Sequence, residues 1–335
     1  MSEKYSIGNE IKSSVEKMVR DFQSKGGLRT VYLVACGGSL FELNPLEYLL
    51  KCEAKGVFCA SITANEFFYA PPVRADRSAL VIAMSLSGNT PEVVSAAEKA
   101  RELGATVVTI TGKENCALAG NADFHFVFSN EAAGGEIDYE RSNMAIALRI
   151  GFELLHQIEG YAHYEKAVKG FEVLNRSLQG VRKKVQRRAR VFGEAHKDDA
   201  FIYTVGSGPS YGLAKALSVC IFMEMEWIHS SVIHSGEMFH GPFECVNFDM
   251  PFVLFMSEGK TRYLDERARN FVERQSGRVT LIDARELGVS ILAPEVEEYF
   301  SGLYTWIAAM EYAKEIAFAK RHPLFERRYM GKEAY

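Results

Sequence analysis

The chain has 335 residues, of which 47% are hydrophobic and 24% are charged, and its formal net charge is −4. This length exceeds what one hydrophobic core usually holds, so we expect two domains. The mild negative charge gives no attraction to nucleic acid or to an anionic membrane surface. No apolar run reaches the roughly 18 to 20 residues of a membrane span, and the polar start does not resemble a signal peptide. We therefore expect a cytoplasmic protein without nucleic-acid or membrane partners.

The six cysteines give no sign of a metal site or a disulfide framework. No two of them form a CxxC pair, which argues against a zinc ribbon or a thioredoxin-type motif. Several lie inside apolar runs, where a free cysteine behaves as a small hydrophobic residue. We expect reduced thiols and no bound metal.

In the first half, short apolar runs alternate with amphipathic helical patterns. The runs typical of strands are TVYLVAC (30–36), GVFCASI (56–62), ALVIAMS (79–85), TVVTIT (106–111) and FHFVFS (124–129). Because these runs are apolar throughout, they predict a parallel sheet covered by helices on both faces. After the third run, Thr90 and Pro91 predict a helix start with a Thr cap, and Gly104 predicts its end.

A helical stretch separates this half from a second series of strand-like runs. Residues 138–195 contain few helix breakers, and their basic centre is more typical of a solvated helix face than of a nucleic-acid patch. Strand-like runs resume at 201–207, 227–233, 251–257 and 278–284, before a long helical pattern over 295–320. We predict a first domain over 1–165, a helical connector over 166–195 and a second domain over 196–335.

The two halves carry matching loops after matching strands. VACGGS (34–39) and MSLSGNT (84–90) correspond to VGSGPS (205–210) and MSEGKT (256–261). Ser39 and Ser85 are 46 residues apart, and Ser210 and Ser257 are 47 apart. The equal order and near-equal spacing predict an internal duplication of one α/β domain.

The loop SLSGNT (85–90) has the composition of an anion-binding site. Ser85, Ser87 and Thr90 offer hydroxyl groups, and Gly88 lets the backbone approach a ligand closely. The helix that follows adds free N–H groups and the positive end of its dipole. The chain has no Gly-x-x-x-x-Gly-Lys-Ser/Thr motif, so we predict a phosphomonoester rather than a nucleotide as the ligand.

Two further residues refine this prediction. Ser39 follows the first strand and would reach the same crevice at the carboxyl ends of the strands. In the second half, the matching loop is one residue shorter and carries Glu258, whose carboxylate would repel a phosphate. We therefore predict one phosphate site per chain, in the first half.

The segment FMEMEWIHSSVIHSGEMFHGPFE (222–244) gathers groups that exchange protons near neutral pH. Glu224 precedes a predicted strand, and His240 follows 16 residues later, in a loop with Gly-Pro. A carboxylate and an imidazole can remove and return a proton without a metal or an organic cofactor. From the residues alone, a solvated carboxylate and a surface histidine remain alternatives.

Together with ACGGS (35–39), SLSGNT (85–90) and VGSGPSYG (205–212), this segment resembles the double sugar-isomerase (SIS) domain family over nearly the whole chain. The stretches CIFMEMEWIHS, EGYAHYE and RRYM are most similar to its Amadori-product deglycase branch. Within that branch they are most similar to enzymes acting on 6-phosphofructose-aspartate, and next to those acting on fructoselysine 6-phosphate. The resemblance implies two tandem SIS domains, each a doubly wound parallel sheet flanked by helices.

The resemblance also implies roles for individual residues. Glu224 matches the base next to the sugar carbonyl, and His240 matches an imidazole that assists ring opening and proton transfer. In relatives this imidazole comes from the neighbouring subunit, which implies a homodimer. The positions that match the holders of the sugar phosphate are Ser39, Ser85, Ser87 and Thr90. As a separate group we expect supporting roles for Gly37, Gly38, Gly88, Asn89, Glu237 and Lys332, with Glu237 anchoring the loop of His240 by hydrogen bonds. No cofactor and no metal are implied.

The chain departs from the amino-sugar synthase of this family at several positions. Leu86 and Asn89 replace the Gln and Glu of its phosphate loop, and Ile221 stands where the synthase has a Lys. The tail lacks a Lys at the synthase's C-terminal catalytic position, although Lys332 is near. These differences disfavour glucosamine synthesis.

We therefore expect a deglycase that splits a 6-phosphorylated fructosyl amino acid into glucose 6-phosphate and the free amino acid, through an enaminol and an imine. The leading substrate is 6-phosphofructose-aspartate. The alternatives are a fructoselysine-6-phosphate or glucoselysine-6-phosphate deglycase, another phosphosugar isomerase or amino-sugar deaminase, and a non-enzymatic sugar-phosphate sensor. If aspartate is released, a basic residue should meet its extra carboxylate, in a pocket of loops and the C-terminal tail, but the sequence does not identify that residue.

Overall fold

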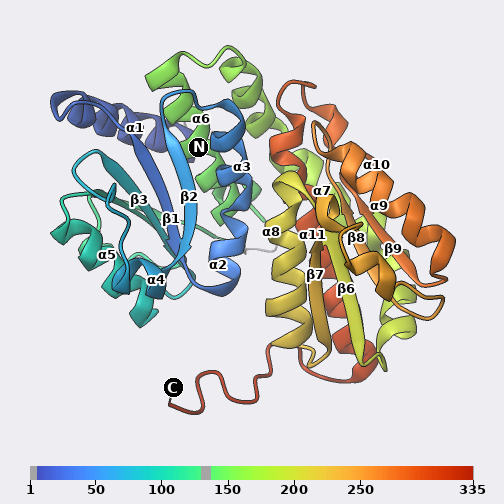
Figure 1. The fold of residues 1–335 in the computed structure, drawn as a ribbon. Helices are drawn as coiled ribbons and strands as arrows, with labels where there is room; N and C mark the ends of the chain where they lie inside the picture. Colours follow the sequence, from blue (N-terminus) through green and yellow to red (C-terminus); the bar gives the residue numbers. More distant parts are fainter. Residues whose placement is uncertain (1–5, 130–136, 335) are drawn as a thin grey trace. The chain divides into compact units, whose positions relative to one another are not determined.

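The computed structural model describes residues 6–129 and 137–334, which form two compact α/β units (Figure 1). The units comprise Met1–Asn175 and Arg176–Tyr335, and each has a parallel sheet flanked by helices. The predicted fold class is confirmed. The division between the units falls within the long helix α7 (Tyr164–His196), so the stretch expected as a connector belongs to one continuous helix. In the part of the chain described, no helix is both long and apolar enough to cross a membrane.

Five parallel strands form the first sheet, in the order β2-β1-β3-β4-β5. They are β1 (Thr30–Ala35), β2 (Phe58–Thr63), β3 (Ala79–Ser85), β4 (Thr106–Thr111) and β5 (Phe124–Val127). The helices of this unit before α7 are α1 (Ile7–Ser24), α2 (Gly37–Glu42), α3 (Asn44–Glu53), α4 (Ala64–Tyr69), α5 (Pro91–Glu102) and α6 (Asn143–Glu159), with short 3-10 turns η2 (Ala119–Asn121) and η3 (Tyr139–Arg141). Strands β1, β3 and β4 are buried at every position, as their apolar sequences predict.

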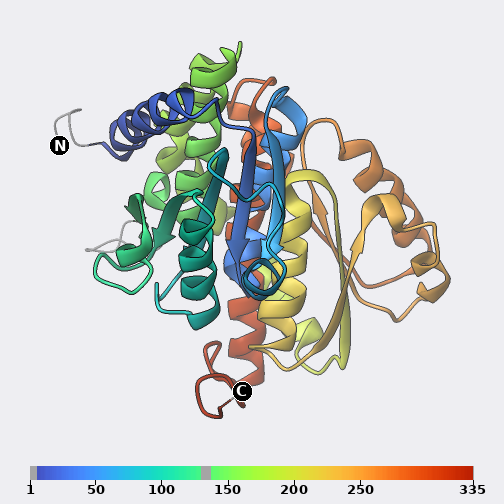
Figure 2. The same ribbon diagram turned by 60° about the vertical axis from the view of Figure 1, so that its left-hand side comes forward.

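Helices cover both faces of this sheet. On one face, Phe67 of α4 and Val93 and Ala97 of α5 pack in one core cluster with Tyr32 and Val81 of the strands. On the other face, α6 contacts α1, α3 and β4 (Figure 2). Loops, among them the phosphate loop, follow the strands at the carboxyl end of the sheet.

Four parallel strands form the second sheet, in the order β7-β6-β8-β9. They are β6 (Phe201–Gly206), β7 (His229–His234), β8 (Phe252–Met256) and β9 (Val279–Asp283). The helices are α8 (Tyr211–Ala216), α9 (Arg262–Gln275), α10 (Ala284–Leu287) and α11 (Glu297–Lys320), with 3-10 turns η4 (Gly208–Ser210), η6 (Ser235–Glu237), η7 (Pro242–Cys245) and η8 (Val289–Ile291). This order repeats β2-β1-β3-β4 of the first unit, which supports the predicted duplication.

A π-helix precedes the predicted catalytic carboxylate. Helix α8 continues into η5 (Leu217–Met223), whose hydrogen bonds reach five residues back, as from Glu224 N to Val219 O (3.2 Å). Such wide turns occur frequently at functional sites. The strand expected from Trp227 begins at His229 instead, because Trp227 has a left-handed backbone (φ 57°) that a strand does not allow.

Candidate functional site

The loop 85–90 lies where β3 ends and α5 begins, and its three hydroxyl side chains gather together. Ser85 Oγ lies 2.9 Å from Thr90 Oγ1 and 3.5 Å from Ser87 Oγ, and it accepts a hydrogen bond from Gly88 N (3.2 Å). Thr90 is the residue before the first turn of α5, but its side chain makes no capping hydrogen bond. The predicted Thr cap is therefore wrong for the side chain, which joins the hydroxyl cluster instead. This arrangement suits an anion bound by hydroxyls and by the first amides of α5.

A second loop braces the hydroxyl cluster. Gly88 has φ +66°, and a Cβ atom there would lie 2.3 Å from Cys116 Sγ, so the position requires glycine. Gly88 O accepts a hydrogen bond from Leu118 N, and Asn89 Oδ1 accepts one from Ala117 N, both at 2.9 Å. Asn89 therefore supports the shape of the loop through its side-chain oxygen.

Ser39 lies at the same edge of the sheet as this loop. It is half-buried in the first turn of α2, after Gly37 and Gly38, and α2 directly follows β1. Strand β1 lies between β2 and β3 and pairs with both. The chain therefore passes from β1 to β2 on one side of β1, and then to β3 on its other side. Ligands of open α/β sheets bind in the crevice at such a point, which is where Ser39 and Ser85 both lie.

In the second unit, the corresponding loop is filled by the protein's own side chains. Glu258 is buried and pairs with Arg285 (Oε2 to Nη2, 2.9 Å). Glu298 of α11, also buried, accepts a hydrogen bond from Lys260 N (3.2 Å), the amide that corresponds to Asn89 N in the first unit. In the first unit Asn89 N donates to the neutral hydroxyl of Ser87 (3.1 Å), so the two loops differ in that only the second places a carboxylate of the protein at this amide, where it would repel a phosphate.

Glu224 follows the π-helix directly and meets a residue of the C-terminal tail. Its Oε1 accepts a hydrogen bond from Arg327 Nε at 2.6 Å, and the two side chains are 24% and 16% exposed. The predicted base is therefore partly buried and paired with a guanidinium. Sequence reasoning missed this pair because 103 residues separate its members.

Lys332 lies further along the same tail. Its Nζ pairs with Glu326 Oε1 at 2.6 Å and also donates to the backbone carbonyl of Arg327. Lys332 therefore closes the turn that carries Arg327. Its supporting role at the site stays a prediction.

Glu226, two residues after Glu224, is a second candidate that sequence reasoning missed. It is fully buried, and neither of its carboxylate oxygens has a hydrogen-bond partner among the described residues. Burial raises its pKa to about 7, against an opposing influence of Lys320. A carboxyl group with such a pKa is a general candidate for proton transfer. The stretch MEMEW (223–227) presents both glutamates, but nothing in it shows which of them is buried.

Replacing Glu226 by Gln should stabilise the protein above neutral pH. Burial raises the pKa of Glu226 from 4.5 to about 7, so its favourable contribution is complete below pH 4.5 and is lost as the pH rises through 7. Because Gln needs no proton, Glu226→Gln should gain up to about 3 kcal/mol in unfolding free energy at pH 8, and little at pH 4.5. Urea unfolding at both pH values measures the difference. Glu244→Gln, at an exposed position, is the control, and an equal gain at both pH values would contradict the assignment.

His240 lies in the turn that follows β7. Its side chain is exposed, and its backbone N donates to Glu237 O at 3.0 Å, so Glu237 shapes the loop through its carbonyl group. His234 has a structural place: its Nδ1 accepts a hydrogen bond from Gly236 N (3.1 Å), and burial lowers its pKa. Within residues 6–129 and 137–334, no hydrogen bond or ion pair joins His240 to Glu224.

Asp265 of α9 anchors the start of the His240 loop. Its Oδ1 accepts hydrogen bonds from Ser235 Oγ and Ser207 Oγ, both at 2.6 Å, and its Oδ2 accepts one from Ser257 N (3.2 Å). Burial raises the pKa of Asp265 to about 6, although the three hydrogen bonds favour its charged form. Asp265 thereby ties together the loops after β6, β7 and β8. Its role depends on contacts between distant segments, so no local pattern in the sequence predicts it.

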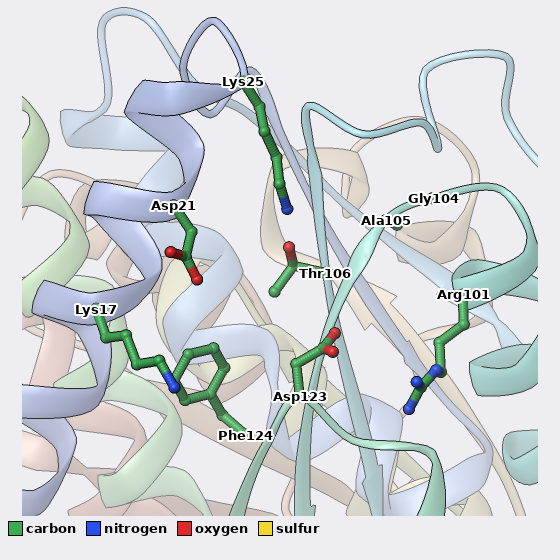
Figure 3. Close-up of a pocket in the computed structure, with 9 residues that line it drawn as sticks. All are labelled: Lys17, Asp21, Lys25, Arg101, Gly104, Ala105, Thr106, Asp123 and Phe124. Atoms are coloured by element: carbon green, nitrogen blue, oxygen red, sulfur yellow. The ribbon is translucent and has the colours of Figure 1, made fainter.

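A pocket of about 350 Å³ opens at the amino end of the strands of the first sheet (Figure 3). Lys17 and Asp21 of α1 line it with Lys25, which directly follows α1, and with Thr106 and Phe124 at the starts of β4 and β5. This is the amino end of the parallel strands, whereas the hydroxyl loop lies at their carboxyl end. The pocket is therefore not part of the phosphate site.

Comparison with known proteins places this fold and loop in a class of phosphosugar proteins. The family model described as "SIS domain" matches residues 28–134. Fructosamine deglycase FrlB of Bacillus subtilis (strain 168) is 35% identical over 97% of this chain and 98% of its own length. Fructoselysine 6-phosphate deglycase of Escherichia coli (strain K12) is 28% identical over 95% of this chain and 88% of its own length. The chain belongs to the SIS domain family, within the branch that contains these deglycases.

Solved structures agree with this placement. A Salmonella typhimurium LT2 protein assigned to the phosphosugar isomerases is 39% identical, with a TM-score of 0.93 and 97% of each chain covered. The C-terminal domain of glucosamine-fructose-6-phosphate aminotransferase from Francisella tularensis is 17% identical, with a TM-score of 0.76 over 95% of this chain and 93% of that one. The second comparison shows a shared fold alone.

Proposed function

We propose that the protein is a deglycase that cleaves a 6-phosphorylated fructosyl amino acid, with 6-phosphofructose-aspartate the leading substrate. The products are glucose 6-phosphate and the free amino acid. The observation that carries the proposal is the similarity to fructosamine deglycase FrlB along 97% of the chain. The choice of aspartate rests on the stretches of residues 159–165, 220–230, 233–244 and 327–330, and the experiment below tests this choice separately.

Glu224 is the proposed base of this reaction. An Amadori compound carries its amine on C1 and a ketone at C2, and its cleavage reverses the Amadori rearrangement. Glu224 removes a proton from C1 to give an enaminol, and a proton returned to C2 leaves an imine between C1 and the nitrogen. Water then hydrolyses the imine to the aldehyde of glucose 6-phosphate and the free amine. His240 is the proposed partner in ring opening and proton return, a type of step that contributes about 10² to 10⁴ in rate.

The hydroxyl loop is the proposed holder of the 6-phosphate. Ser87 and Thr90 each place a hydroxyl within hydrogen-bond distance of Ser85 Oγ at the start of α5, and Ser39 also lies at the carboxyl end of the sheet. Backbone amides at a helix start favour an anion through both their N–H groups and the helix dipole. Holding the non-reacting end of the substrate fixes the position of C1 and C2 for proton transfer.

One assay tests the proposal directly. The protein is incubated with 6-phosphofructose-aspartate and with fructoselysine 6-phosphate, and glucose 6-phosphate is measured with a coupled dehydrogenase. We expect product from the aspartate compound at the higher kcat/KM. A higher value for the lysine compound would correct the leaving group, and no product from either would remove the deglycase proposal in favour of another phosphosugar reaction or a sensor.

We also propose a homodimer in which the His240 loop serves the neighbouring subunit. The exposed His240 side chain and the lack of a described contact with Glu224 motivate this arrangement. Glu224→Gln and His240→Ala chains should each be inactive alone. If each active site combines residues of two subunits, mixing the two variants should restore up to about a quarter of the wild-type activity, since half of the dimers then hold one intact site. Mixed dimers without activity would place both residues of a site in one chain.

A further inference from the structure

The C-terminal tail, defined here as residues 320–332, contacts each of the four residues 224–227 that surround the proposed base. Lys320 Nζ donates to the carbonyl of Glu226, and His322 Nε2 donates to that of Met225 at 2.8 Å. Arg328 lies over the ring of Trp227, 4.2 Å from its centroid, and Arg327 pairs with Glu224. These contacts hold the tail against the base at successive points.

Arg327 is the member of this set that touches a group proposed to react. Its Nε donates to Glu224 Oε1 at 2.6 Å, and its Nη1 donates to the carbonyls of Leu324 (3.4 Å) and Glu326 (3.2 Å). Among the described residues, neither Arg327 Nη2 nor Glu224 Oε2 makes a hydrogen bond. A guanidinium binds a carboxylate best through two parallel N–H groups. On the side of Arg327 that carries Nε and Nη2, only Nε is hydrogen-bonded, so Nη2 can still donate to a further carboxylate.

This pair sets a chemical problem for the proposed reaction. A carboxylate that accepts a hydrogen bond from a guanidinium takes a proton from carbon less readily, because its charged form is already stabilised. The substrate proton can go to Glu224 Oε2, which makes no hydrogen bond among the described residues, and loosening the contact of Arg327 with Oε1 would make that transfer easier. A second anion placed beside Arg327 would draw the guanidinium away from Glu224.

A fructosyl amino acid linked through its α-nitrogen supplies such an anion. Its carboxylate is separated from the nitrogen on C1 by a single carbon, so it arrives next to the atom from which Glu224 removes a proton. Two carboxylates side by side repel each other unless a cation lies between them. The partly buried Arg327 is the cation that contacts Glu224.

We propose that Arg327 binds the α-carboxylate of the amino-acid part of the substrate and thereby releases Glu224 to act as the base. This inference rests on the proposed deglycase function and adds a specificity residue to it. Arg327 then selects substrates with a carboxylate one carbon from the sugar-linked nitrogen. Fructosyl amines without that carboxylate leave Arg327 on Glu224 and react slowly.

Two matched substrates test this role: 6-phosphofructosyl glycine and 6-phosphofructosyl methylamine, which differ only in the carboxylate. The wild-type protein should prefer the glycine compound by about 10- to 100-fold in kcat/KM, the range expected for hydrogen bonds to a charged group. Arg327→Gln should bring this ratio close to 1 and leave the methylamine compound at least as reactive as in the wild type. Arg327→Lys, which keeps the charge, should retain part of the preference.

Arg328→Gln is the control, because Arg328 contacts Trp227 rather than Glu224, and it should keep the wild-type ratio. If Arg327→Gln lowers both kcat/KM values and keeps their ratio, Arg327 only positions the tail and the inference is wrong. Equal reactivity of both compounds with the wild-type protein would also overturn it, while leaving the deglycase function intact. If the wild-type protein cleaves neither compound nor 6-phosphofructose-aspartate, the proposed function itself fails. If Arg327→Gln does not fold, the role of Arg327 is still tested by two measurements. These are the ratio of the two kcat/KM values in the wild-type protein and the same ratio in Arg327→Lys.

Discussion

Replacing Glu224 by Gln is expected to lower kcat by about 10² to 10⁴, whereas Glu226→Gln should keep kcat near the wild-type value. The two residues are close in sequence but differ in surroundings. Glu224 is 24% exposed beside Arg327, where a substrate proton can reach it, while Glu226 is fully buried. Gln preserves the shape of each side chain but can neither take a proton nor carry the negative charge.

The pair of variants separates two possible bases. Steady-state kinetics with 6-phosphofructose-aspartate gives kcat, and thermal stabilisation by glucose 6-phosphate shows that each variant still binds ligand. A large loss with Glu226→Gln and a small one with Glu224→Gln would reassign the base to Glu226, the carboxyl whose pKa burial raises to about 7. A large loss in both would point to a proton passed between them.

Replacing Gly88 by Ala should raise KM for phosphorylated substrates by more than about tenfold, because the hydroxyl loop cannot keep its shape. An alanine Cβ would lie 2.3 Å from Cys116 Sγ and 2.6 Å from its Cβ, so the two loops have to move apart. The left-handed backbone adds a cost of about 1 to 2 kcal/mol for any residue with a Cβ atom. The measurements are KM and the thermal shift produced by inorganic phosphate.

Gly160→Ala is a closely matched control in the same unit. Gly160 has φ +65°, almost the value of Gly88, but a Cβ there would meet no atom within 4 Å. The control should therefore share the backbone cost and leave KM unchanged. Similar KM values for both variants would show that the loop 85–90 tolerates the displacement and would weaken its assignment as the phosphate holder.

The sequence was sufficient to predict the architecture because its signals are local. Five apolar runs in the first half and four in the second became strands, and the repeated loops at near-equal spacing anticipated the shared strand order. The strand expected from Trp227 started two residues late, since a left-handed residue cannot be read from hydrophobicity.

The candidate site was predictable only in part. Loop 85–90 is contiguous, so its hydroxyl cluster could be inferred from composition. Arg327 and Glu298 act through partners 103 and 38 residues away, and Asp265 acts through partners 8, 30 and 58 residues away. Hydrophobic periodicity does not predict such contacts. The Thr90 side chain shows the same limit, because its choice between capping α5 and joining Ser85 depends on the three-dimensional course of the loop.

The carboxylate of Glu298 in the second unit has a thermodynamic consequence. It serves the loop of that unit as a permanently tethered anion, so this loop needs no ligand from solution. In the first unit the corresponding amide, Asn89 N, donates to the neutral hydroxyl of Ser87, and a bound phosphate group would stabilise that loop by mass action, by about 2.7 kcal/mol at one hundred times the dissociation constant. An increasing ligand concentration should therefore raise the melting temperature of the first unit and leave that of the second nearly constant. The two halves of one duplicated fold then differ in whether their stability depends on metabolite concentration.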